Sequence, residues 1–139
     1  MTDLEIAVKN LEGHSICLCK DGEYFTLDGK GISPIMKLLG EGKDICGYSV
    51  ADTVVGKAAA MLFVKAGIKD LHAKLMSKPS EAFLKKAHIP YTYETLAENI
   101  KNRTGTDICP MEKTVENIED ADTAYEALKN KLLSLKKGV

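Results

Sequence analysis

One segment near the middle of the chain limits its fold more than any other. Residues 44–50 have the pattern of a strand, and residues 51–64, which follow directly, are an almost wholly apolar helix candidate. A helix that is apolar on nearly every face must be buried. Lys57 lies near the start of this predicted helix, where a cation opposes the helix dipole. We therefore expect an anionic partner for Lys57, either Asp52 or a bound phosphate or carboxylate.

Length and charge exclude several classes of protein. A chain of 139 residues fits one domain, so we predict a single domain over residues 1–139. Its 19 Lys and Arg against 20 Asp and Glu give a net charge of -1, which leaves no global field to attract nucleic acid or an acidic membrane. The longest apolar run, residues 58–64, is far shorter than the roughly 20 residues of a membrane-spanning helix, and the first residues lack a secretory signal. We expect a cytoplasmic protein without nucleic-acid or membrane partners.

The four cysteines show no metal-ligand spacing. Cys17, Cys19, Cys46 and Cys109 include no Cys-x-x-Cys pair and have no histidine at a familiar zinc spacing. In a reducing compartment they are most simply free thiols. Cys17 and Cys19 alternate along a predicted strand, so they share one of its faces and should pack as small apolar groups. We predict no metal site and no cofactor.

Alternating strand and helix patterns follow a predicted hairpin. Asp21 and Gly22 favour a two-residue turn between strands over residues 15–20 and 23–27. The remaining elements are predicted as a helix over 4–11, for which strand alternation is the alternative, a helix over 35–39, a strand over 68–76, a helix over 81–87, a strand over 91–95 and a helix over 120–137. Strands that alternate with helices imply parallel crossovers, so the chain should form an α/β fold.

Polar residues are predicted at two helix starts and in one long connection. Ser33 should cap the helix over 35–39, with Pro34 as its first residue, and Ser80 should cap the helix over 81–87. Residues 97–117 are polar and poorly periodic, which predicts a long connection. Such connections are often functional when they are ordered.

Two sequence motifs resemble a known family. The stretch ADTVVGKAAA at residues 51–60 and ICPME at residues 108–112 are similar to DUF1893, a small prokaryotic family of unknown function in the cytidine-deaminase-like superfamily. The resemblance covers nearly the whole chain and implies a three-layer α-β-α architecture, with a mixed sheet of about five strands that begins with the hairpin. Zinc deaminases of that superfamily carry His-x-Glu or Cys-x-Glu at the second helix and Pro-Cys-x-x-Cys at the third. Residues 33–35 and 51–55 contain neither motif, so the resemblance implies the fold without zinc-dependent deamination.

The resemblance also implies a candidate site. In that architecture the N-termini of the second and third helices converge, and their unpaired N–H groups form an anion site. Glycine permits close approach of the backbone to a ligand, and lysine supplies a point charge for phosphate. The alternative for the residues at the two helix starts is a structural role: Asp52 and Ser33 as helix caps, Gly56 as a packing glycine and Lys57 as a solvated lysine. The candidate ligand-binding residues at these two starts are Lys30, Gly31, Ser33, Asp52, Thr53, Gly56 and Lys57.

A second candidate feature lies in the long connection. Pro110 suits the first position of a helical turn, which would make Cys109 its N-cap and Glu112 the reciprocal partner of a capping box. A thiol at a helix N-terminus has a lowered pKa and can act as a nucleophile or redox sensor. The alternative is a buried cysteine that anchors the connection.

Three functions remain open from the sequence. The first is a zinc-free deaminase-like domain that binds a small anionic metabolite, such as a nucleotide, between the two helix starts. The second is an enzyme of another chemical class that uses Lys57 or Cys109 as acid, base or nucleophile. The third is an interaction module that forms homo-oligomers through a sheet edge or the final helix.

Overall fold

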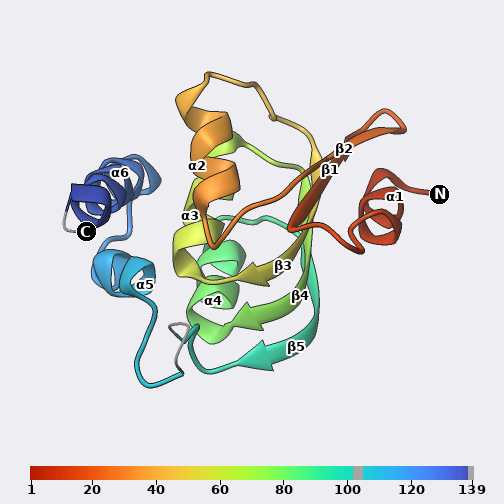
Figure 1. Cartoon of the computed structure of the whole chain (residues 1–139). Coiled ribbons are helices and arrows are strands. Elements are labelled where there is room, and N and C mark those ends of the chain that lie inside the picture. Colours follow the sequence, from red (N-terminus) through yellow and green to blue (C-terminus); the bar gives the residue numbers. More distant parts are fainter. Residues whose placement is uncertain (102–104, 138–139) are drawn as a thin grey trace.

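The structure, a computed structural model, describes residues 1–101 and 105–137 and contains one mixed β-sheet with helices on both faces (Figure 1). In chain order the elements are α1 (Asp3–Lys9), β1 (Ile16–Lys20), β2 (Glu23–Leu27), α2 (Ser33–Gly40), β3 (Ser49–Val55), α3 (Lys57–Ala66), β4 (Asp70–Ser77), α4 (Lys78–Lys86), β5 (Tyr91–Ala97), α5 (Pro110–Val115) and α6 (Ala121–Lys137). The α/β class predicted from the sequence is confirmed.

The sheet has five strands in the order β2-β1-β3-β4-β5. β1 is antiparallel to both β2 and β3, whereas β3, β4 and β5 run parallel to one another. The predicted hairpin at the start of the sheet is confirmed, and its turn residues Asp21 and Gly22 have φ of 54° and 80°. Such positive φ values are those of the turns that match the twist of a two-residue hairpin.

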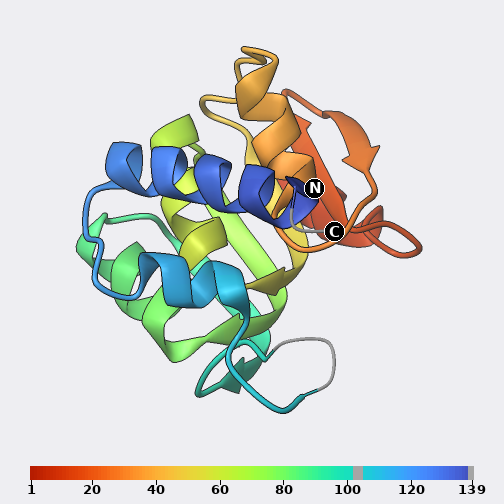
Figure 2. The same cartoon turned by 60° about the vertical axis from the view of Figure 1, so that its left-hand side comes forward.

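The helices form layers of unequal thickness. Among the helices that the structure describes, α1 is the one that packs on the first face of the sheet, over β1 and β3, where it encloses a small core of Ala7, Leu11, Cys17, Cys19 and Ala51. The shared face predicted for Cys17 and Cys19 is therefore confirmed. α2, α3 and α4 cover the opposite face. α5 and α6 pack on α3 rather than on the sheet, with α6 crossing α3 towards α2 (Figure 2).

The predicted border between strand and helix at residue 51 was wrong. β3 continues to Val55, and α3 begins at Lys57 with Gly56 as its N-cap. Three β-branched residues in a row, Thr53, Val54 and Val55, favour the strand. The helix itself is buried along its first two turns, as its apolar composition required. Asp52 and Thr53 are consequently presented by the carboxyl end of a strand and not by a helix start.

Two predicted helix caps were also wrong. α2 begins at Ser33 with Ile32 as its N-cap, and no side chain caps it. α4 begins at Lys78, and the hydroxyl of Ser77 accepts the N–H of Ser80. In both helices proline occupies the second position, which is tolerated because N–H groups of a first helical turn lack intrahelical partners. The long connection predicted over 97–117 contains α5, which begins at Pro110 as its sequence suggested.

Candidate functional site

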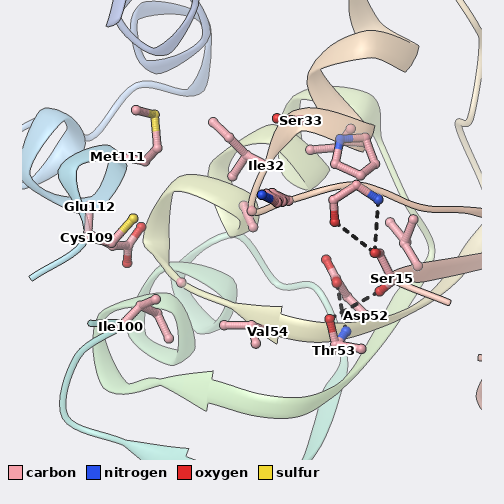
Figure 3. A pocket seen from close by; sticks show the side chains of 18 of the residues that line it. Ser15, Ile32, Ser33, Asp52, Thr53, Val54, Ile100, Cys109, Met111 and Glu112 are labelled. Carbon is pink, nitrogen blue, oxygen red and sulfur yellow. Dashed lines mark hydrogen bonds between the residues drawn. The ribbon is translucent and has the colours of Figure 1, made fainter. Parts of the chain in front are cut away.

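A cavity of about 670 Å³ opens at the carboxyl end of β3, below the starts of α2 and α3. The loop before α2 forms one side of it, and α5 and the last turns of α6 form the other. Figure 3 shows Ser15, Asp52 and Thr53 on one side of this cavity and Cys109, Met111 and Glu112 on the other. Its apolar walls are formed by Ile16, Ile32, Pro34, Ile35, Val54, Ala59, Ile100, Met111, Leu132 and Leu135.

Asp52 lies on the floor of the cavity. It pairs with Ile16 of β1 and Ala73 of β4 across the sheet, so its backbone is flanked by apolar residues. The N–H of Thr53 donates to Asp52 Oδ1 at 2.7 Å. Burial nevertheless raises the pKa of the Asp52 carboxyl to about 7, although this hydrogen bond lowers it. Among the residues that the structure describes, Asp52 forms no ion pair.

Ser15 ties the loop before α2 to the sheet. Its hydroxyl donates to the carbonyl oxygen of Gly29 at 2.9 Å and accepts the N–H of Gly29 at 3.1 Å. Its own carbonyl oxygen accepts the N–H of Thr53 at 3.2 Å. These bonds fix the spacing between the loop and β3, where the cavity lies. No sequence motif marked Ser15, because its role depends on two segments that are distant in the chain.

Glu112 supplies the anion at the start of α3. Its carboxylate oxygens accept the N–H of Lys57 at 2.7 Å and the N–H of Ala58 at 2.8 Å. A Cβ at Gly56 would overlap this carboxylate, so the close approach requires glycine. Burial raises the pKa of Glu112 against the effect of the two hydrogen bonds. The helix start that the sequence predicts as a ligand site is therefore filled by the chain itself.

The predicted capping box within α5 was wrong. Cys109 is the N-cap of α5, as predicted, but its side chain makes no capping hydrogen bond, and Glu112 reaches α3 instead of its own helix. The thiol of Cys109 does line the cavity.

The side chain of Lys57 points away from the cavity. Its ammonium donates to the carbonyl oxygen of Glu116 at 3.2 Å and to Glu119 Oε1 at 3.3 Å. The predicted pairing with Asp52 is thus contradicted: the partner comes from the segment between α5 and α6. The reason is the position of Lys57 as the first residue of α3, which directs its long side chain towards the end of α5.

The structure brings together all but one of the candidate site residues. Lys57 lies outside the cavity, and it borders a smaller hollow with Glu119 beside α4. The sequence did not identify Ile100, Met111, Leu132 and Leu135 as cavity residues, and the two leucines lie in the helix predicted over 120–137. The candidate residues that line the cavity are Lys30, Gly31, Ser33, Asp52, Thr53, Gly56, Cys109 and Glu112.

Neither a metal-binding cluster nor a membrane-spanning helix is found in residues 1–101 and 105–137. In this part of the chain, no three or more His, Cys, Asp or Glu side chains are grouped so that they could hold a metal ion. No helix there combines the length and the apolar character that crossing a bilayer requires.

Comparison with known proteins identifies the family. The family described as TM1506, Domain of unknown function (DUF1893), matches residues 7–132. The chain belongs to the DUF1893 family. The crystal structure of a DUF1893 family protein (TM1506) from Thermotoga maritima superposes with a TM-score of 0.86 at 25% identity, covering 94% of this chain and 91% of that chain. The family membership predicted from the sequence motifs is confirmed.

A second solved structure shows a more distant similarity to this chain. A diaminohydroxyphosphoribosylaminopyrimidine deaminase/5-amino-6-(5-phosphoribosylamino)uracil reductase from Thermotoga maritima has a TM-score of 0.42 at 15% identity, covering 65% of this chain and 34% of that chain. The chain has no significant match among curated protein sequences.

The cavity of this DUF1893 protein has two chemically different ends. Lys30 and Lys101 are exposed and line its rim, whereas the carboxyls of Asp52 and Glu112 lie inside. The two carboxyls differ in their bonding, because Glu112 is held by the N-terminus of α3 and Asp52 only by its own strand. The arrangement can bind a molecule of mixed polarity between apolar walls.

Proposed function

We propose that this DUF1893 domain binds a small anionic metabolite, of which a nucleotide is one example, in the cavity between α2, β3 and α5. The cavity itself is the observation that carries the proposal. Its volume of about 670 Å³ falls in the roughly 300–1,000 Å³ range of small-molecule sites, and apolar walls with a few convergent polar groups are typical of such sites. Binding, and not turnover, is the function proposed.

The anionic group of the ligand would lie at the rim. Glu112 already occupies the start of α3, so of the two helix starts that the sequence predicts as an anion site, the start of α2 remains for a bound anion. Lys30, Gly31 and Ser33 lie at that start, and Lys101 lines the same cavity. Helix N–H groups and lysine ammonium groups both favour phosphate or carboxylate, which supports this orientation.

The body of the ligand would lie between the apolar walls. Ile16 and Val54 of the sheet face Met111 of α5 and Leu135 of α6 across the cavity. Val54 and Leu135 line the cavity and are each 44% exposed, so a bound molecule would cover part of both side chains. A flat or compact apolar body, such as a nucleobase, suits such walls.

A thermal-shift screen tests this proposal. Purified protein is titrated with nucleotides, nucleosides and other phosphorylated metabolites, because a ligand that binds only the folded state must raise the unfolding temperature. We expect a shift for at least one phosphorylated compound, and we expect Lys30→Ala to weaken its affinity by roughly twofold to fivefold, as the loss of an exposed charge pair would. Lys37→Ala, on the exposed side of α2, should leave the affinity unchanged. If no compound gives a shift, the interaction module becomes the better hypothesis.

A further inference from the structure

Asp52 is the one carboxyl in the cavity whose charge no other group of the described chain balances. Glu112 accepts two backbone N–H groups at the start of α3, and the charge of Lys57 acts to lower its pKa against the effect of burial. Asp52 has hydrogen bonds from its own neighbours on β3 but no ion pair, and no cation contributes to its shifted pKa of about 7. An unpaired carboxylate in an apolar site is unfavourable for folding. This feature therefore calls for an explanation other than stability.

We propose that Asp52 recognises an N–H-bearing nitrogen group, an amidine-type edge or its protonated form, at the inner end of the bound molecule. The inference rests on the proposed function of the cavity and adds the chemistry of the buried end of its ligand. An ionised carboxylate accepts two parallel N–H bonds from a protonated amidine group, and such charge-assisted pairs are the strongest hydrogen bonds in proteins. The ligand thus supplies the partner that the protein lacks.

The charged groups around the cavity favour a ligand whose nitrogen group lies at Asp52 and whose anionic group lies near the lysines. The charged and titratable groups that line the cavity are Lys30 before α2, Lys101 after β5, and Cys109 and Glu112 of the α5 region. Both lysines are exposed, and across the sheet Asp52 pairs with the apolar residues Ile16 and Ala73. A molecule with an anionic outer end and a nitrogen-rich inner end matches this distribution of charge.

A matched pair of probes tests the proposal on the 139-residue chain. Benzamidine is a cation at all pH values used, and benzamide is its neutral isostere. Each is titrated into labelled protein by NMR, and the amide signals of the cavity residues report where it binds. If Asp52 must be ionised to bind the cation, benzamidine affinity rises about 30-fold from about pH 5.5 to about pH 8.5, while benzamide affinity stays constant.

Variants separate this role from a structural one. Asp52→Asn keeps the shape of the side chain and removes its charge, so benzamidine should bind no better than benzamide at any pH. Asp44→Asn, at an exposed site outside the cavity, should reproduce the wild-type profile. The comparison of the two probes in the wild-type protein needs no variant, so it stands even if Asp52→Asn does not fold.

Three results would overturn the inference. The first is equal affinity for the two probes at about pH 8.5, and the second is a pH-dependent rise that persists in Asp52→Asn. Either would leave the proposed function intact, because the response of phosphorylated ligands to Lys30→Ala is a separate measurement. The third result, no contact of either probe with the cavity, would count against both proposals.

Discussion

The ionisation of Asp52 makes the stability of this protein depend on pH in an unusual direction. Burial raises the pKa of the carboxyl from 3.8 to about 7 in the folded state. The folded protein therefore holds the proton more tightly than the unfolded chain between these values, and the free energy of unfolding falls as pH rises through this window. The loss has an upper limit of about 4 kcal/mol, since each unit of pKa shift corresponds to about 1.4 kcal/mol.

Asp52→Asn should remove this dependence. We expect the free energy of unfolding of the variant, relative to that of the wild type, to increase steadily from about pH 4 to about pH 7 and to level off above it. Urea denaturation of both proteins at several pH values measures this difference. Parallel pH profiles would show that the carboxyl is not desolvated in the folded protein.

Lys57 is also a buried charged residue, but we expect its charge to have little effect on the free energy of unfolding. Its ammonium lies at the start of α3, where the helix dipole opposes a cation, and its acidic partner Glu119 has a side chain that is 63% exposed. We expect Lys57→Met to change the free energy of unfolding by less than about 1 kcal/mol, because the apolar stem is retained and no buried charge is left unpaired. Chemical denaturation measures the change.

Ligand affinity in the same variant tests the site prediction for Lys57. Because the side chain lies outside the cavity, Lys57→Met should bind any cavity ligand as the wild type does. A loss of binding without a loss of stability would restore Lys57 to the functional site.

At the scale of elements, Gly56 and Glu112 join α5 to α3. A Cβ at Gly56 would displace the Glu112 carboxylate, so Gly56→Ala should destabilise the protein by about 1–3 kcal/mol. Gly40→Ala at the end of α2 is the control. A Cβ there meets no atom within 4 Å, and replacing a helical glycine should be neutral or stabilising by up to about 1 kcal/mol. Denaturation midpoints of the two variants give the comparison.

A double-mutant cycle isolates the contact. In a Glu112→Ala background the space beside Gly56 is empty, so Gly56→Ala should lose most of its effect, with an interaction energy of at least about 1 kcal/mol. Additive effects of the two substitutions would mean that Gly56 is required for a reason other than the approach of Glu112.

The contact between Gly56 and Glu112 also shows which features of the elements could not be predicted from the sequence. Turn residues and periodicity correctly predicted the hairpin and the strands near β4 and β5, but the strand predicted over 44–50 overlaps β3 only at its first two residues, and the helix predicted over 51–64 includes most of α3. Its start was misplaced because alanines beyond Gly56 extend the helical pattern, whereas the β-branched run before it favours the strand. The cap supplied by Glu112 lies more than 50 positions away in sequence, and local rules relate a carboxylate only to its own helix.

For the whole molecule, the resemblance to the family implied the three layers, whereas nothing in the sequence predicted how the cavity is closed. The hairpin and the three parallel strands followed from turn residues and alternation. The packing of α6 across α3, which brings Leu132 and Leu135 to the start of α2, depends on tertiary contacts. An apolar stripe on a helix predicts burial but does not name the surface that it covers, so these cavity residues could not be predicted.

The sequence predicts that the protein binds no metal, and the effect of metal ions on its stability tests this prediction. A metal that binds only the folded state raises its stability, and its removal lowers it. The acidic residues and the cysteine of the cavity are held apart: Glu112 is engaged by α3, Asp52 belongs to β3, and Cys109 precedes α5. Since the described residues offer no group of three ligands, chelators should leave the unfolding temperature unchanged, and added Zn²⁺ should not raise it. Stoichiometric zinc by elemental analysis, together with a lower unfolding temperature after chelation, would contradict this prediction and require Cys109 and the two carboxylates to move together.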